Sequence, residues 1–154
     1  MKIIEQEEVR KLLQPKDCIQ LMAEALKGLE SGEYAQPARL ITVMPNTAKF
    51  GFMPAYVGDY FGAKVISAFA PNMGTKYPSH IGYVMLFESA HSTVAGMIEA
   101  GSITEIRTGA VSAAATDLLA RKDSHKLALI GAGAQARSHL AAIREIRDIT
   151  SVTV

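Results

Sequence analysis

One segment of the chain constrains its fold more than any other. An apolar run over residues 127–130 leads into the pattern G-x-G-x-x-A, formed by Gly131, Gly133 and Ala136, and a helical stretch continues to about residue 147. A strand, a glycine-rich turn and a helix in this order are typical of the start of a dinucleotide-binding domain. Residues 151–154 then predict a second, parallel strand.

The residue types in this turn suit a phosphate ligand. Gly131 permits a tight turn out of the strand, Gly133 lets the backbone approach a pyrophosphate, and Ala136 lets helix and strand pack closely. Ala134 and Gln135 supply the first helical amides, which point at the phosphates. A tight turn without any ligand is the alternative. The residue that grips the ribose is expected at or just beyond Val154, so NAD and NADP both remain open.

The preceding residues divide into helical and strand-like regions. Residues 5–33 are expected to be helical, with Pro15 in a first turn and an apolar stripe that includes Ile19 and Leu26. Residues 38–99 predict short strands of an antiparallel or mixed sheet, separated by turn residues, at 40–44, 50–57, 61–69, 81–87 and 93–99. Pro54 places its strand at an edge or a bulge.

A further helix is expected over residues 102–121. Ser102 and Glu105 form a capping-box pattern at its start, and its many alanines allow close approach to a neighbouring element. The polar residues 122–125 then mark a domain boundary. We therefore expect an α/β protein, with a mixed α+β domain over 1–122 and the truncated first β-α-β of a Rossmann domain over 123–154.

Composition excludes several other classes of protein. The 154 residues carry a net charge of +1, so no strong attraction to nucleic acid or to anionic membranes is expected. No apolar stretch is long enough for a membrane span, and the acidic residues near the N-terminus argue against a signal peptide. The four histidines show no metal-ligand spacing, so no metal is expected. The single cysteine, Cys18, fits a reducing, cytoplasmic setting.

Four segments together resemble one family. They read F-M-P-A-Y at 52–56, G-A-K-V-I-S at 62–67, I-T-E-I-R-T-G-A-V-S-A at 103–113 and G-A-G-A-Q-A at 131–136. Their order and spacing are similar to those of the ornithine cyclodeaminase/mu-crystallin family, and the resemblance covers essentially the whole chain. The family usually has Asp-Gly before the helix that starts near Ser102, whereas this chain has Glu99-Ala100.

The resemblance implies an enzyme that uses NAD or NADP. Such enzymes transfer a hydride at the α-carbon of a small amino or imino acid, and some members, the cyclodeaminases, convert ornithine to proline. Family members are about twice as long, so this chain resembles an N-terminal half and is expected to be inactive alone. The family also implies a homodimer formed through the N-terminal sheet. The alternative is a non-catalytic binding or dimerising module of the mu-crystallin type.

The resemblance also assigns roles to individual residues. Arg39 matches an arginine that binds the substrate carboxylate, and Lys64 matches a catalytic lysine near that carboxylate and the reacting carbon. Arg107 matches an arginine that contacts the cofactor phosphate, and Ser79 stands where a cofactor-contacting threonine is common. From the residues alone, a surface arginine at a strand start is the favoured interpretation of Arg39, and a solvated helix arginine is the alternative for Arg107. Lys64 fits either a solvated edge or a functional cleft.

Overall fold

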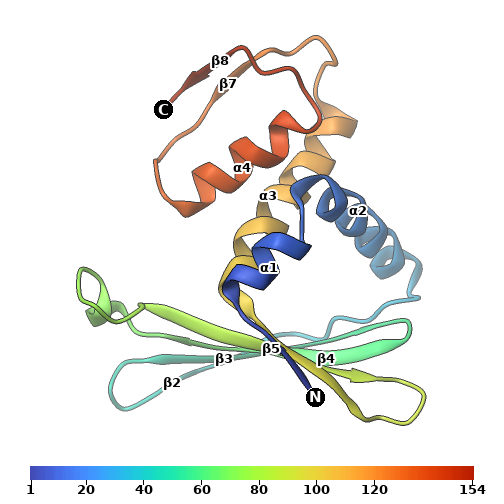
Figure 1. Ribbon diagram of the computed structural model, residues 1–154, viewed down its shortest axis with the longest axis vertical. Coiled ribbons are helices and arrows are strands. Elements are labelled where there is room, and N and C mark those ends of the chain that lie inside the picture. Colours follow the sequence, from blue (N-terminus) through green and yellow to red (C-terminus); the bar gives the residue numbers. More distant parts are fainter. The chain divides into compact units, whose positions relative to one another are not determined.

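The computed structural model describes all 154 residues, which form two compact units (Figure 1). The first unit contains Met1–Val9 and Lys27–Gly101, and the second contains Arg10–Leu26 and Ser102–Val154. These units do not coincide with residues 1–122 and 123–154. The division of the chain into those two domains therefore stays a prediction.

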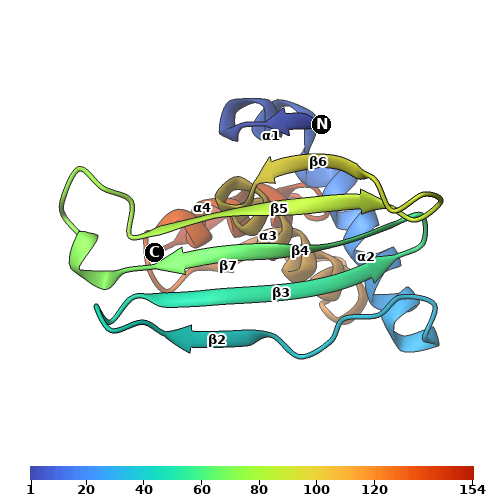
Figure 2. The ribbon, with the colours of Figure 1, turned by 90° about the horizontal axis from the view of Figure 1, so that it is seen from below.

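A six-stranded, mostly antiparallel sheet dominates the first unit. Its order is β1-β6-β5-β4-β3-β2, with only β1 and β6 parallel (Figure 2). The strands are β1 (Lys2–Ile4), β2 (Leu40–Val43), β3 (Lys49–Val57), β4 (Tyr60–Ala68), β5 (His80–Glu88) and β6 (Val94–Glu99). The five expected strands are confirmed to within two residues at each end. Strand β1 was not expected from the sequence.

Pro54 does not lie on an edge strand, contrary to expectation, because β3 lies between β2 and β4. Strand β2 pairs with β3 only as far as Phe52. The Tyr56 N–H donates to the Ala35 carbonyl at 2.8 Å on this side of β3. Phe52, Pro54 and Tyr56 direct their backbone groups to the same side of β3, because alternate residues of a strand do so. The Pro54 nitrogen therefore faces the space between the β2 pairing and the Ala35 hydrogen bond. The missing N–H of proline therefore removes no ladder hydrogen bond.

The four α-helices are α1 (Gln6–Leu12), α2 (Pro15–Ser31), α3 (Ala100–Leu119) and α4 (Ala134–Arg144). A short 3-10 helix, η1, covers Ala70–Asn72. The helical region expected over 5–33 is confirmed as α1 and α2, and Pro15 is the first residue of α2. No helix of the protein is long and apolar enough to span a bilayer.

Helix α3 begins two residues earlier than the capping box predicts. Ser102 lies inside its first turn and therefore is not the N-cap. The residue before the helix, Glu99, accepts a hydrogen bond from the Gly101 N–H instead. Glu105 forms an ion pair with Arg10, with 2.7 Å between Nη2 and Oε2. The first turn thus begins directly after β6, and a glutamate side chain satisfies one of its free amides.

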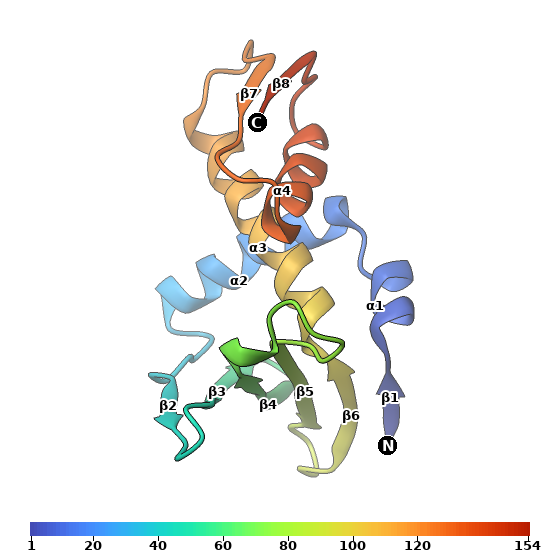
Figure 3. The same cartoon turned by 90° about the vertical axis from the view of Figure 1, so that its left-hand side faces the viewer.

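A parallel β-α-β arrangement forms the C-terminal part of the second unit. Strands β7 (Lys126–Ala128) and β8 (Ser151–Thr153) pair in parallel, and α4 connects them. The core comprises the buried Ala113 of α3 with Ala142 and Ile143 of α4, and around them pack Ile19, Leu127, Ile146 and Ile149. Helices α3 and α4 cross closely (Figure 3), which confirms the close approach that the alanines predict.

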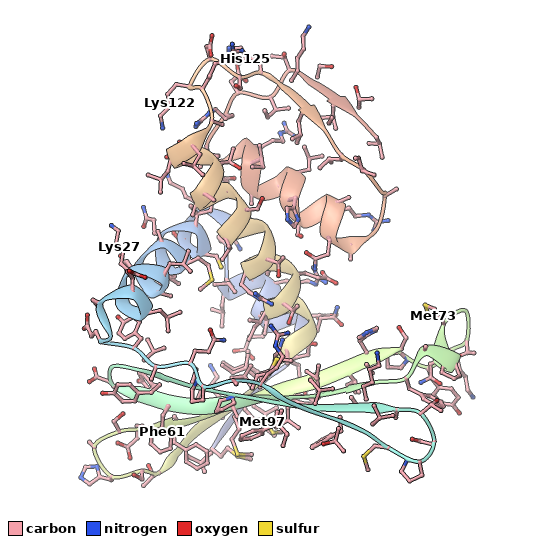
Figure 4. All side chains as sticks on the ribbon, turned by 180° about the vertical axis from the view of Figure 1, so that it is seen from behind. Lys27, Phe61, Met73, Met97, Lys122 and His125 are labelled. Carbon is pink, nitrogen blue, oxygen red and sulfur yellow. The ribbon has the colours of Figure 1, made fainter.

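The two faces of the six-stranded sheet differ in character. We call one the aromatic face, defined by Phe50, Phe52, Tyr56, Phe61, Ile81, Met85, Phe87 and Met97. Figure 4 shows Phe61 and Met97 on this side, and the Phe61 and Phe87 rings stack with centroids 5.3 Å apart. The opposite face, which we call the lysine face, carries Lys64.

Candidate functional site

Lys64 lies inside the sheet, and Arg39 directly precedes its edge strand β2. Lys64 of β4 pairs with Met53 of β3 and with Val84 of β5. The β2–β3 pairing begins at Leu40 and Phe52, so Arg39 lies just outside it. Residues opposite one another share a face, so Met53 and Lys64 both belong to the lysine face.

The surroundings of Lys64 are apolar and made of small residues. Gly62 and Ile66 flank it on β4, and Gly51 and Ala55 occupy the same face of β3. Gly51 is buried, and a Cβ there would lie 2.8 Å from Ile66 Cγ1 and 2.9 Å from Ile41 Cδ1. Lys64 itself is half-buried on an interior strand. This position is not the solvated edge that the sequence left open.

Ser79 lies just before β5, on the loop that follows η1. Its carbonyl accepts a hydrogen bond from the Phe69 N–H at 2.8 Å, and its hydroxyl lies 3.1 Å from His80 Nδ1. Ser79 is half-buried and belongs to the first unit, as do Arg39 and Lys64. Its contact with a cofactor stays a prediction.

The glycine-rich turn has the backbone that a phosphate site needs. Gly131 has φ of 107°, in the region that favours glycine. Gly133 is the N-cap of α4, and a Cβ there would meet no atom within 4 Å. No side chain caps the helix, and its first internal bond runs from the Arg137 N–H to the Gly133 carbonyl at 3.3 Å. The preceding amides, including those of Ala134, Gln135 and Ala136, therefore remain for a ligand.

These features fit the pyrophosphate of a dinucleotide. The position above Gly133 is open, so the backbone can approach a bulky anion. The amides of Ala134 and Gln135 stand at the positive end of the helix dipole. The residues of this turn account only for contacts with the pyrophosphate, not with the adenine, the ribose or the nicotinamide of such a cofactor.

Arg107 lies on α3, eight residues into the helix, and its side chain is exposed. Two residues later, at Gly109, α3 crosses α4. Burial raises the pKa of the Cys18 thiol, and the positive charge of Arg107 partly offsets this effect. Arg107 and the glycine-rich turn, with Gly131, Gly133, Ala134, Gln135 and Ala136, all belong to the second unit.

A groove that sequence reasoning missed lies beside the first turn of α4. It has a volume of about 530 Å³ and reaches from Arg10 and Glu105 to Ala134 and Arg137. One sequence signal was available: Arg137 follows the glycine motif and places a cation in the first helical turn, where the helix dipole disfavours positive charge. No group of three or more His, Cys, Asp or Glu side chains is placed to hold a metal ion.

Together these elements define an α/β protein with a mostly antiparallel sheet, followed by a parallel β-α-β unit whose glycine-rich turn leaves free amides. The chain belongs to the ornithine cyclodeaminase/mu-crystallin family, whose model matches residues 1–154. The resemblance seen in the sequence motifs is therefore confirmed.

Curated relatives agree with this assignment. The chain is 36% identical over 121 residues to the mouse ketimine reductase mu-crystallin, a match that covers 77% of this chain and 38% of the relative. It is 30% identical over 161 residues to the Δ1-pyrroline-2-carboxylate reductase of Colwellia psychrerythraea, covering 100% of this chain and 49% of the relative. The chain thus spans about half the length, or less, of these relatives.

Solved structures show the same fold. The Δ1-pyrroline-2-carboxylate reductase of Thermococcus litoralis, in complex with NADH and L-proline, is 32% identical with a TM-score of 0.91, covering 99% of this chain and 48% of that one. An archaeal alanine dehydrogenase dimer with bound NAD is 28% identical with a TM-score of 0.93, covering 99% and 47%. The relatives are thus nicotinamide-dependent oxidoreductases of amino and imino acids.

Proposed function

We propose that this chain takes part in NAD(P)-dependent hydride transfer at the α-carbon of a small amino or imino acid. The observation that carries the proposal is the uncapped N-terminus of α4, which follows the open glycine-rich turn in a chain of this family. The relatives named for imino acid reduction and alanine oxidation support the same chemistry.

The second unit supplies the groups for the cofactor phosphates. The amides of Ala134 and Gln135 donate hydrogen bonds to the pyrophosphate, and Gly131 and Gly133 give the backbone room to do so. Arg107 adds a positive charge. A bound nicotinamide supplies or accepts the hydride. This set of residues does not choose between NAD and NADP.

The lysine face supplies the groups for the substrate. The planar guanidinium of Arg39 suits a carboxylate. The Lys64 ammonium adds a second positive charge on the lysine face. An ammonium over an apolar floor has few competing water contacts, so its interaction with a carboxylate is stronger there than in bulk water. We assign Lys64 the catalytic role and Arg39 the role of orienting the carboxylate. The alternative reaction for the same residues is deamination with ring closure, which is the cyclodeaminase reaction.

The aromatic face supports a homodimer. Phe50, Phe52 and Ile81 are exposed there, together with Leu40 and Tyr56. An apolar surface of this kind is typical of an interface between subunits. A related alanine dehydrogenase is a dimer. We propose that two copies of this chain associate through their aromatic faces.

Turnover tests the proposed activity. The full-length protein is mixed with NADH or NADPH and a panel of cyclic and open-chain imino acids, and oxidation of the cofactor is followed by absorbance. Oxidation is expected with at least one imino acid, and Lys64→Ala should lower the rate by at least about 10²-fold. The relatives are about twice as long as this chain. We therefore expect residues 1–154 by themselves to bind the cofactor but not to convert the substrate.

Lys49→Ala is the matched control. Lys49 is an exposed lysine on the lysine face of β3, two side-chain rows from Met53. Its substitution should leave the rate unchanged. Full activity of Lys64→Ala, or no cofactor oxidation with any imino acid, would contradict the proposal.

A further inference from the structure

Arg147 is the most completely engaged side chain of the second unit. Only 4% of the side chain is exposed. Its guanidinium lies at the C-terminal end of α3 and donates there to the Asp117 carboxylate and to four backbone carbonyls. These belong to Thr116 (3.4 Å), Asp117 (3.4 Å), Ala120 (3.2 Å) and Arg121 (3.2 Å).

These hydrogen bonds form a joint, by which we mean the attachment of Arg147 to the C-terminal end of α3. The last carbonyls of a helix have no partner within the helix, and they form the negative end of its dipole. A planar guanidinium with five N–H donors can satisfy several of them at once, which an ammonium cannot. Arg147 belongs to the connection between α4 and β8, so it fixes this connection to the end of α3.

Helices α3 and α4 also contact each other directly at a second place. A Cβ at Gly109 of α3 would lie 2.5 Å from the Ser138 carbonyl oxygen, so the two helix backbones touch at this crossing. Along α3, Asp117 is eight residues, or about 12 Å, beyond the crossing. Along α4, Gly133 is five residues, or about 8 Å, from the crossing, on the side away from Arg147. With the Arg147 joint lost, α4 is held to α3 by the Gly109 crossing and by the packing of Ala142 and Ile143 with Ala113, and we expect the glycine-rich turn to move.

We propose that Arg147 is a positioning residue for the cofactor phosphate site. By holding α4 at a second point, it sets where the glycine-rich turn lies relative to Arg107 on α3. This inference rests on the proposed function, since it assumes that the turn and Arg107 act on one ligand. Arg147 touches neither the turn nor the ligand, and it acts through the orientation of α4.

Lys122 provides a matched control. Its ammonium lies 2.7 Å from the same Asp117 carboxylate oxygen, but its side chain is 74% exposed. It also belongs to the residues just after α3, so it makes no bond to the α4–β8 connection. Substitution of Lys122 therefore removes a cation from Asp117 without releasing α4.

The test compares Arg147→Met, Arg147→Lys and Lys122→Met in isotope-labelled chain. Residual dipolar couplings give the orientation of α4 relative to α3 without any cofactor. A titration with NADH, followed at the amides of residues 131–135, gives the affinity. Arg147→Met should reorient α4 and weaken NADH binding by about tenfold or more, because an error of about 1 Å in a site has large effects. Arg147→Lys should give a smaller change, and Lys122→Met none.

Unchanged α4 orientation and affinity in Arg147→Met would overturn the inference, and so would equal changes in Lys122→Met. If Arg147→Met does not fold, Arg147→Lys is judged by the same criteria. Failure of the unsubstituted chain to bind NADH would contradict the proposed function instead. In that case the orientation of α4 still shows whether Arg147 positions the turn.

Discussion

The backbone carbonyl of Ser138 in α4 lies directly against Gly109 in α3, which leaves no room for a side chain at Gly109. Both residues belong to segments that carry the candidate cofactor site. Gly109 follows Arg107 by two residues, and Ser138 lies one turn after the glycine-rich turn. Glycine at this position therefore lets the two helices, and with them the two candidate phosphate-binding elements, come close together.

We expect Gly109→Ala to destabilise the protein. In an exposed helix position this change stabilises by about 1 kcal/mol through helix propensity. At the crossing the new methyl meets backbone, which cannot rotate away, so overpacking should cost about 1–3 kcal/mol. Urea unfolding measures the difference. Ala115→Gly, at an exposed position of the same helix, calibrates the propensity effect. A more stable Gly109→Ala variant would show that the helices are not in backbone contact.

Arg147→Met should lower the free energy of unfolding by about 2–4 kcal/mol, because it removes the buried guanidinium from the Asp117 carboxylate and from the carbonyls at the end of α3. Lys122→Met removes an exposed ion pair and should change stability by at most about 1 kcal/mol. Chemical denaturation of the two variants provides the comparison. Equal losses would mean that both cations serve only to balance the charge of Asp117.

Asp117 should contribute to stability in a pH-dependent way. Hydrogen bonds from Arg147 and then Lys122 lower the pKa of its carboxyl below the ordinary value of 3.8. A group whose pKa is lower in the folded state stabilises fully above its unfolded pKa, and this contribution is lost as pH falls through the folded pKa. The unfolding temperature, measured from about pH 5 to about pH 2, should fall less steeply in Asp117→Asn than in the unsubstituted chain.

The control for this measurement is Asp123→Asn. Asp123 pairs with Arg121, and both side chains are largely exposed. The pH dependence of this variant should match that of the unsubstituted chain. A profile for Asp117→Asn that also matches would show that Asp117 is not held by Arg147 in solution.

Phe52→Glu should prevent the proposed dimer. The Phe52 side chain is 41% exposed on the aromatic face, and a carboxylate there would be buried without a partner between two copies. Sedimentation velocity should show a shift from dimer to monomer. Val43→Glu places the same charge on the lysine face of the same sheet and should leave the dimer intact. A dimer that tolerates Phe52→Glu but not Val43→Glu would place the interface on the other face.

Local patterns predicted most of the elements but not their long-range partners. Alternating apolar residues located strands β2 to β6, since each strand carries its own pattern. Strand β1 has only three residues and pairs with Gly96, far away in sequence, so nothing local marked it. Glu105 completed a capping-box pattern, but its partner is Arg10. The partners of Arg147 lie up to 31 residues away, which no spacing rule relates to it.

The candidate site shows the same limit. The motif at 131–136 predicted this turn because the positive φ of Gly131 favours glycine and the open space at Gly133 needs a residue without a side chain. The interior position of Lys64 depends on strand order and register, which the sequence alone did not supply.

Binding of NADH at the glycine-rich turn is the most direct test of the account. Isotope-labelled chain is titrated with NADH, and with nicotinamide riboside as a control that lacks the phosphates. We expect NADH to shift the amide signals of residues 131–135 in a saturable way and nicotinamide riboside to leave them in place. Gly133→Val, which puts a branched side chain in the open position, should abolish the shifts. NADH that leaves these amides unmoved, or moves them equally in Gly133→Val, would contradict a cofactor phosphate site at this turn.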